Sequence, residues 1–253
     1  MSDFLKPIER HAQTSTPPEK DVLLDGWHLR STGGRTRRFN SVNFQGEPSG
    51  NIPLDEKLSK VEQFYEARNQ TPLFRITPLV EPTDLPDYLK AHGYVSADET
   101  DVLAQPIDPD IRQKSDPAVE ISSVLTPEWL DALSLLTGKN EEQSHSFEEM
   151  LNRLEIQPLF AAYLTGTQIT SIGFATVSDG IMGLFEFATA ENFRRRGQAE
   201  AVVNALLREA AERKLGTAYL QVVCANEAGQ AFWRQMGFNH PVCTYYYMHR
   251  PVS

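Results

Sequence analysis

The chain has 253 residues and a formal net charge of -10, with 40% hydrophobic and 23% charged residues. These values are typical of a globular protein, in one large domain or two small ones. The acidic balance argues against general nucleic-acid binding, because a surface that neutralises phosphates needs positive patches. No apolar run approaches the roughly 20 residues that cross a bilayer, and the first residues lack the apolar core of a secretory signal. We therefore expect no membrane partner and a cytoplasmic location.

The first part of the chain predicts a leader and a mixed α/β segment. Residues 1–20 are polar and contain Thr16-Pro17-Pro18, which predicts a flexible leader or an edge arm. Strand patterns at 22–24 and 27–30 lead into Gly33-Gly34, a turn signal. Further expected elements are a helix from Leu54 to Arg68, a strand at 73–76, a helix at 84–92 and a strand around 102–104.

The second part begins after residues 106–118, whose Pro, Asp and charge predict a linker. Thr126 and Pro127 predict the start of a helix that ends at Gly138. Ser146, with Glu149 three residues on, predicts the cap of a helix over 147–154. Further expected elements are strands at 159–165, 168–177, 181–188 and 218–223, a long helix ending at Gly216, a helix at 226–236 and a strand near 242–249.

The stretch from Ile181 to Ala211 is the best candidate for a ligand site. An apolar strand leads into the turn Arg194-Arg195-Arg196-Gly197-Gln198-Ala199, which opens directly into a helix. Backbone N–H groups at a helix start lack intrahelical partners, the helix dipole is positive there, and small residues leave room for a phosphate. An Arg run can also be a solvated face. The pattern predicts an anion site at this turn.

The two halves of the chain look like imperfect copies. The strands at 73–76 and 219–222 each precede a short helix that ends in Gly plus an aromatic residue, Gly93-Tyr94 and Gly237-Phe238. The turn before the first-half helix, at 48–53, has no Arg-x-x-Gly-x-Ala pattern. Only the second copy is therefore expected to hold a phosphate in this way.

Two motifs, in order, resemble the GNAT superfamily of acetyl-CoA-dependent N-acetyltransferases. Its Gln/Arg-x-x-Gly-x-Gly/Ala fingerprint is matched by Arg194, Gly197 and Ala199. Its second element, an Asn before a short helix ending in Gly-Phe, is matched by Asn226, Phe232, Gly237 and Phe238. The resemblance implies an α/β (α+β) fold with two GNAT copies. Each copy is a mixed, mostly antiparallel twisted sheet flanked by helices, with a splayed central parallel strand pair in the C-terminal copy.

The resemblance also implies a domain organisation and a cofactor site. The expected segments are a leader (1–20), a degenerate GNAT-like domain (21–105), a linker (106–118) and an acetyl-CoA-binding domain (119–253). Backbone N–H groups at the turn would bind the CoA pyrophosphate, and the end of the preceding strand would pair with the pantetheine. Asn226 would lie beside the pantetheine or acetyl end, cap its helix, or both. The residues expected to bind acetyl-CoA are Phe187, Ala188, Thr189, Arg194, Arg195, Arg196, Gly197, Gln198, Ala199, Asn226, Phe232 and Trp233.

Glu186 is the expected catalytic base, because an amine must lose a proton before it attacks a thioester. An ionised Glu between two Phe residues, on a strand face shared with Leu184 and Ala188, is costly unless it is paired or used. A structural ion pair with an Arg is the alternative. Glu141 and Glu142, expected in a loop, are either binding groups for a cationic substrate or ordinary surface acids.

At the position of the acid that protonates the leaving thiolate, this chain departs from the family pattern. Many family members place a Tyr seven residues after the Asn, and this chain has Trp233 there. Tyr245 and Tyr247 on the last strand, with Tyr246 between them, are substitutes, although a Tyr run also serves core packing. An acid is dispensable if the thiolate leaves without full protonation.

The expected function is transfer of the acetyl group of acetyl-CoA to a primary amine, by direct attack on the thioester. The acceptor is expected to be a small molecule in preference to a protein N-terminus or lysine. The alternative function is a non-catalytic acyl-CoA-binding or sensor module, favoured by Trp233 and by the missing cofactor turn in the first half. Two cysteines, Cys224 and Cys243, have neither CxxC nor metal-ligand spacing, so we expect free thiols and no metal. A monomer or a homodimer is expected.

Overall fold

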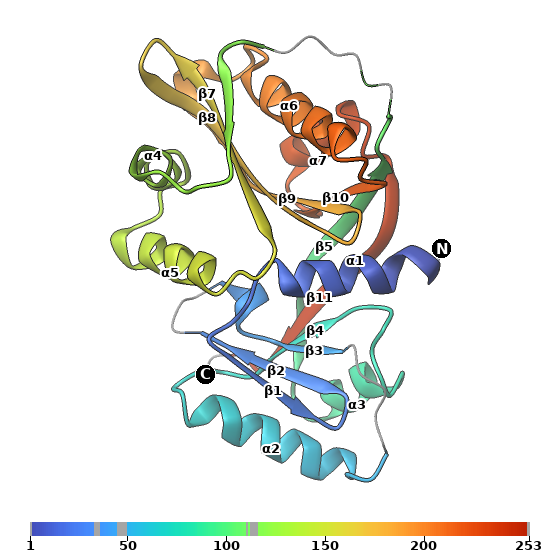
Figure 1. Cartoon of the computed structure of the whole chain (residues 1–253). Coiled ribbons are helices and arrows are strands. Elements are labelled where there is room, and N and C mark those ends of the chain that lie inside the picture. Colours follow the sequence, from blue (N-terminus) through green and yellow to red (C-terminus); the bar gives the residue numbers. More distant parts are fainter. Residues whose placement is uncertain (1, 33–35, 45–49, 110, 112–115, 252–253) are drawn as a thin grey trace. The chain divides into compact units, whose positions relative to one another are not determined.

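The computed structural model describes residues 2–32, 36–44, 50–109, 111 and 116–251 (Figure 1). The chain divides into two units. The first comprises Met1–Asp101, Val223–Asn226 and Val242–Ser253, and the second comprises Val102–Val222 and Glu227–Pro241. Within the described ranges, no helix is both long enough and apolar enough to cross a membrane.

The first unit is a mixed sheet with helices. Its elements are α1 (Ser2–Thr14), β1 (Lys20–Leu24), β2 (Trp27–Ser31), the 3-10 helix η1 (Arg37–Phe39), β3 (Val42–Phe44), α2 (Leu54–Glu66), β4 (Leu73–Ile76), α3 (Leu85–Ala91), the first part of β5 (Val95–Pro106) and most of β11 (His240–His249). The strand order is β1-β2-β3-β4-β11-β5, with β3 and β4 parallel and β4 and β11 antiparallel. Leu58, Val61 and Tyr65 of α2 pack in the core with Trp27 and Phe74, as the helical spacing predicts.

Helix α1 replaces the flexible leader expected at 1–20. Leu5, Ile8 and Ala12 are buried and recur at helical spacing, so one face of this polar segment is apolar. Glu9, on the same face, receives Nη1 and Nη2 of the buried Arg75 on β4, the second bond at 3.0 Å. Two charges taken out of water persist only when they are paired, so this ion pair holds α1 in place.

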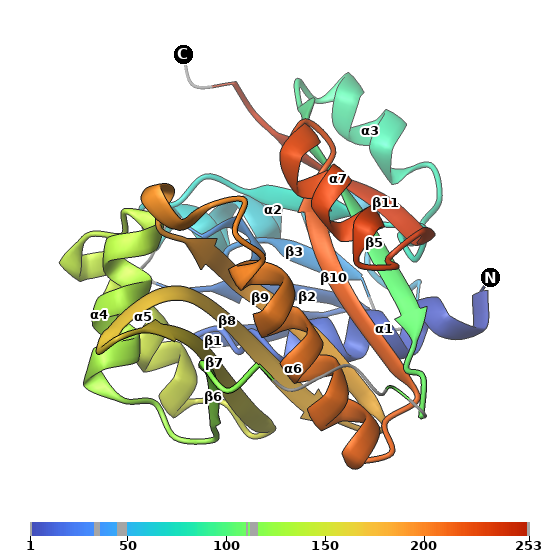
Figure 2. The same cartoon turned by 90° about the horizontal axis from the view of Figure 1, so that it is seen from above.

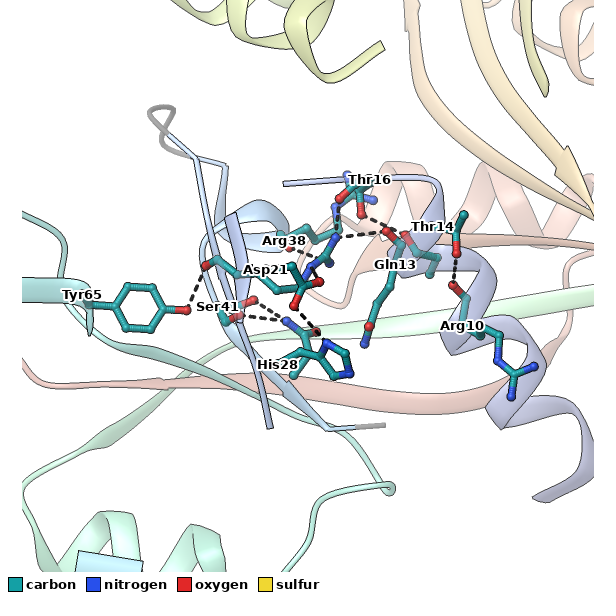
Figure 3. Close-up of polar contacts among 12 residues, drawn as sticks. Arg10, Gln13, Thr14, Thr16, Asp21, His28, Arg38, Ser41 and Tyr65 are labelled. Carbon is teal, nitrogen blue, oxygen red and sulfur yellow. Dashed lines mark hydrogen bonds and ion pairs between the residues drawn. The ribbon is translucent and has the colours of Figure 1, made fainter. Parts of the chain in front are cut away.

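A second buried arginine, Arg30 on β2, binds the end of α1. Its Nη2 donates to the carbonyls of Gln13, at 3.0 Å, and Thr16 (Figure 3). Its Nη1 donates to the carbonyl of Arg38 at 3.3 Å. Burial lowers the pKa of Arg30 to about 10, against the opposing charge of Asp21. Carbonyls at a helix end lack intrahelical donors, and the guanidinium supplies them.

The second unit has helices on both faces of its sheet (Figures 1 and 2). Its elements are the rest of β5, β6 (Val119–Ser122), α4 (Pro127–Thr137), α5 (Glu141–Asn152), β7 (Gln157–Thr165), β8 (Gln168–Ser178), β9 (Ile181–Thr189), the 3-10 helix η2 (Glu191–Phe193), α6 (Gln198–Glu212), β10 (Thr217–Val223) and α7 (Glu227–Gln235). The strand order is β5-β10-β9-β8-β7-β6. Strands β6 to β9 pair antiparallel, and β9 and β10 pair parallel. This is the mixed, mostly antiparallel arrangement that the sequence predicts.

The two faces of this sheet carry different cores. On the α4–α5 face, Trp129 stacks on Phe147, and Phe147 meets Phe174 edge-on. The indole of Trp129 donates to the carbonyl of Ala161 at 3.0 Å. On the other face, Val202 and Leu206 of α6 lie in an aliphatic cluster with strand residues, including Leu184. Covering both faces explains why β8 and β9 are almost continuously apolar.

Two sequence expectations in this region are wrong. Helix α5 begins at Glu141 rather than after Ser146, because Asn140 accepts from the Gln143 N–H and the Gln143 side chain accepts from Asn140 N–H. Glu141 and Glu142 are therefore first-turn helix residues, where acids favour the helix dipole. The last strand, expected in the domain 119–253, belongs largely to the first unit, because β11 pairs with β4.

Some expected boundaries fall on segments that are only partly described. The turn Gly33-Gly34 lies outside the described residues, as do residues 48–49 of the first-half turn at 48–53. The linker expected at 106–118 lies between the end of β5 and the start of β6, and 110 and 112–115 within it are not described.

Candidate functional site

A bulge in β9 sets the direction of Glu186. Ile172 pairs with Ala188 and Phe174 with Phe185, so the β9 segment between these pairs is one residue longer than its β8 partner. Glu186 lies in this bulge with φ 53, a left-handed conformation that is uncommon for a residue with a side chain. Strain of this kind collects at functional sites.

The bulge also breaks the expected alternation of side chains. Phe187 packs on the α6 side, against the aliphatic cluster that contains Leu184. Glu186 contacts Lys139 from the connection between α4 and α5, on the other side. Strict alternation along the strand predicts that Glu186 shares a face with Leu184. The extra residue in the bulge reverses the alternation, so Glu186 lies on the opposite face.

Gly173 on β8 makes room for the bulge. A Cβ atom placed on Gly173 would lie 2.6 Å from Cε1 of Phe187 and 3.0 Å from Cγ1 of Val202. The Phe187 ring lies over the bare backbone and meets Trp233 edge-on, with centroids 5.0 Å apart. A side chain at Gly173 would push this ring away.

Just before the bulge, β9 and β10 part. Their parallel register runs from Thr217↔Ile181 to Leu220↔Leu184 and ends there, although both strands are described further, β9 to Thr189 and β10 to Val223. From Phe185 on, β9 has β8 on one side and no β10 partner in this register on the other. Such an unpaired strand edge offers N–H and C=O groups to an extended ligand. The splayed parallel pair expected from the sequence is present.

The turn after β9 leads into the N-terminus of α6. Gly197 is the N-cap residue with φ 78, and Arg195 also has a positive φ of 60. A glycine cap contributes no side-chain acceptor, so the first-turn N–H groups are left for water or an anion. Arg194, Arg195 and Arg196 are exposed around this turn. The positive helix end and three guanidinium groups suit a pyrophosphate.

Gln198 fastens the start of α6 to the sheet. Its side chain is buried, accepts from the hydroxyl of Thr170 at 2.9 Å and donates to the hydroxyl of Thr165 at 3.2 Å. The sequence predicts that Gln198 binds the CoA pyrophosphate through its backbone N–H. Its side chain is taken up by the two hydrogen bonds to the sheet. The anchor fixes the direction of the helix end.

Lys139 is the ion-pair partner of Glu186. Its Nζ lies 2.7 Å from Oε2 of Glu186, and the two side chains are 24% and 23% exposed. The sequence pattern predicts an Arg as the alternative partner, and it does not single out Lys139. The signal that could have found Lys139 is its position between Gly138, the left-handed C-cap of α4, and Asn140, the N-cap of α5.

Tyr245 and Tyr247 lie in the core of the first unit. Their rings are 5.6 Å apart, and the guanidinium carbon of Arg75 is 3.8 Å from the Tyr245 ring centroid. Burial raises the pKa of Tyr247 well above its usual range. Glu186 belongs to the second unit. Both hydroxyls are therefore placed where core packing already explains them.

Trp233 and its neighbours on α7 form an aromatic group. Trp233 is 8% exposed, and its ring centroid is 5.0 Å from those of Phe187 and Phe232 and 5.5 Å from that of Phe238. It packs behind Phe187 rather than presenting a polar atom in the place of the usual Tyr. Asn226 directly precedes α7, as the motif requires.

A family model matches nearly the whole chain. It is described as "Probable histone acetyltransferase Rv0428c C-terminal" and covers residues 4–246. A related sequence is the uncharacterized N-acetyltransferase YobR of Bacillus subtilis (strain 168), which is 26% identical over 249 residues, 97% of this chain and 98% of that protein.

Solved structures share the fold. A GCN5-related N-acetyltransferase from Kribbella flavida superimposes with a TM-score of 0.70 at 14% identity, covering 98% of this chain and 95% of that one. A tandem GNAT protein from the clavulanic acid biosynthesis pathway gives 0.66 at 9% identity, over 97% and 88%. At these identities the likeness establishes the fold of tandem GNAT proteins.

Proposed function

The chain belongs to the Rv0428c acetyltransferase C-terminal family and to the GNAT superfamily of acyltransferases, and from this we propose that it transfers the acetyl group of acetyl-CoA to a primary amine of a small molecule. The observation that carries the proposal is the parting of β9 from β10 beside the glycine-capped N-terminus of α6. A strand edge and a helix end placed in sequence suit the pantetheine and the pyrophosphate of CoA. The family assignment favours an enzyme over a non-catalytic acyl-CoA sensor.

Each part of the cofactor has residues that suit it. The first-turn N–H groups from Gly197 to Ala199 would hold the pyrophosphate, and the three exposed arginines would add charge. Phe187, Ala188 and Thr189 would pair with the pantetheine amides. The backbone of the same strand would polarise the thioester carbonyl. Asn226 and the α7 aromatics Phe232 and Trp233 would flank the chain of the pantetheine.

Glu186 is the proposed base. Its carboxylate leaves the strand at the bulge, next to the edge where the thioester would lie, and it already holds an ammonium group. A carboxylate that binds an alkylammonium can bind the acceptor and take its proton. The neutral amine then attacks the thioester carbonyl, and the CoA thiolate leaves. Tyr245 and Tyr247 would act as the acid only if their hydroxyls reach the thiolate. A thiolate also departs readily without protonation by an acid.

A melting experiment tests the cofactor site. Acetyl-CoA at 100 times its Kd should stabilise the wild-type chain by about 2.7 kcal/mol. In Gly197→Glu, the new carboxylate would meet the pyrophosphate and the rise in Tm should be largely lost. Gly180→Glu is the matched control, because Gly180 also has a left-handed φ and open space around it. No rise in the wild type, or an equal rise in both variants, would contradict the site.

Thiol release tests the reaction and its acceptor. Free CoA should accumulate when acetyl-CoA and a panel of small primary amines are offered together. A lysine peptide belongs in the panel, because the family description names histone acetylation. Faster release with the peptide than with every small amine would overturn the small-molecule assignment. Binding without release would contradict the enzyme.

A further inference from the structure

The contact between Lys139 and Glu186 places a primary amine on the proposed base. The Nζ–Oε2 distance of 2.7 Å is that of a charge-assisted hydrogen bond. The backbone of Lys139 is fixed on both sides, since Gly138 ends α4 with φ 70 and Asn140 caps α5 within a complete capping box. The amine is therefore presented by a short, defined connection.

Stability alone does not account for this contact. Ion pairs that water still reaches stabilise a fold only slightly, and each of these side chains is about one quarter exposed. Glu186 also adopts a left-handed backbone conformation, which is strained for a residue with a side chain. The stabilisation by the ion pair is thus no larger than the strain of the Glu186 backbone. This balance favours a chemical role for the arrangement.

The chemistry of Lys139 matches that of the proposed acceptor. Its side chain is an unbranched alkylamine, and its ammonium already has the carboxylate that would deprotonate a substrate. Glu186 follows Phe185, where the unpaired edge of β9 begins. A thioester bound along that edge would lie beside the base and the amine that the base holds.

We propose that Lys139 is an acetyl acceptor within its own chain, an inference that rests on the proposed acetyl-CoA-dependent function. Glu186 takes one proton from the Lys139 ammonium, and the neutral Nζ attacks the carbonyl carbon of acetyl-CoA. The C–N bond forms, the C–S bond breaks, and the CoA thiolate takes the second proton from the nitrogen. The products are Nε-acetyl-Lys139, free CoA and the proton that Glu186 passes to water. No other reactant is needed.

Exposed lysines supply an internal standard. Lys90, whose side chain is 58% exposed, pairs with Asp87 at 3.1 Å. Uncatalysed acetylation by acetyl-CoA follows access and amine basicity, so it should favour Lys90 over the less exposed Lys139. Faster acetylation of Lys139 than of Lys90 therefore indicates catalysis.

The experiment is a time course of the full chain with acetyl-CoA, read by peptide mass spectrometry. Lys139 should be acetylated at least about tenfold faster than Lys90, and Glu186→Gln should lower its rate by about 10²-fold or more. Glu212→Gln, which removes the same charge at the exposed end of α6, is the matched control and should retain the rate. The Lys139 rate constant should not change over a tenfold range of protein concentration, as for a reaction within one molecule. Melting curves with and without acetyl-CoA check that each variant folds and binds.

The outcomes separate this inference from the function on which it rests. Equal acetylation of Lys139 and Lys90, while the wild-type chain releases CoA with an external amine, overturns the inference and leaves the function standing. A Lys139 rate that rises with protein concentration overturns the intramolecular step. Absence of an acetyl-CoA-dependent rise in Tm overturns both.

Discussion

Replacing Gly173 by Ala tests the link between the bulge and the proposed cofactor site. The added Cβ would lie 2.6 Å from Cε1 and 2.8 Å from Cζ of Phe187. Carbon atoms in contact prefer about 3.5–4.0 Å, so the ring must move by about 1 Å. It has little freedom to do so, because Val202 is fully buried on one side and Trp233 packs edge-on at 5.0 Å.

The expected cost follows from this geometry. Overpacking of this size typically costs about 1–3 kcal/mol. For a chain of about this length, each kcal/mol lowers Tm by about 2–4 °C. Phe187 follows Glu186 directly, so its displacement should also reshape the strand edge and reduce the stabilisation by acetyl-CoA. Thermal melts with and without acetyl-CoA measure both effects.

Gly216→Ala is the control for this prediction. Gly216 is not among the glycines with positive φ, and the nearest heavy atom to an added Cβ is the Gly180 carbonyl oxygen at 3.9 Å. This substitution should be neutral or stabilising by up to about 1 kcal/mol, since alanine restricts the unfolded chain. If Gly173→Ala melts like Gly216→Ala and binds acetyl-CoA like the wild type, the reasoning about the bulge is wrong.

Glu186→Gln should lower kcat by about 10²–10⁴, and an unchanged kcat with a lower Tm would leave Glu186 a structural residue. Glu9→Gln should cost about 3–5 kcal/mol in urea unfolding, because Arg75 stays buried beside a neutral partner. The double variant Glu9→Leu, Arg75→Met should recover most of that loss, and a single-variant cost below about 1 kcal/mol would refute the buried pair. Burial raises the pKa of Cys243 from 9.0 to about 12. Between these two pH values the folded chain keeps a proton that the unfolded chain releases. The free energy of unfolding should therefore fall as the pH rises through this range. At pH 8, iodoacetamide should modify the less buried Cys224 first and Cys243 only on unfolding, and equal labelling would contradict the burial.

The elements that the sequence predicts well are those decided by local chemistry. Helix α4 is an example, because Thr126 accepts from the Trp129 N–H at 3.2 Å and Gly138 takes the left-handed conformation at the other end. The glycine cap of α6 is another, since the fingerprint that names the family is itself a backbone requirement. Both signals lie within a few residues of the structure that they define.

The features that the sequence does not reveal depend on distant residues. The bulge at Glu186 needs a glycine on the neighbouring strand, and Gly173 looks ordinary in its own strand pattern. The partner of Glu186 is 47 residues away, in a connection that reads as solvent-exposed. Helix α1 is hidden for a similar reason, because its polar composition conceals Glu9, whose partner Arg75 is 66 residues away.

The place of β11 in the first unit has a consequence for synthesis of the protein. Tyr246 of β11 pairs with Ile76 of β4, a separation of 170 residues (246 minus 76). At about 5–20 residues per second, the ribosome needs roughly 10–30 s to make the chain between them. During that time the nascent first unit lacks a strand, and β4 has an open edge that can pair wrongly. The N-terminal half therefore completes its folding last, after the half that carries the proposed acetyl-CoA site has been made.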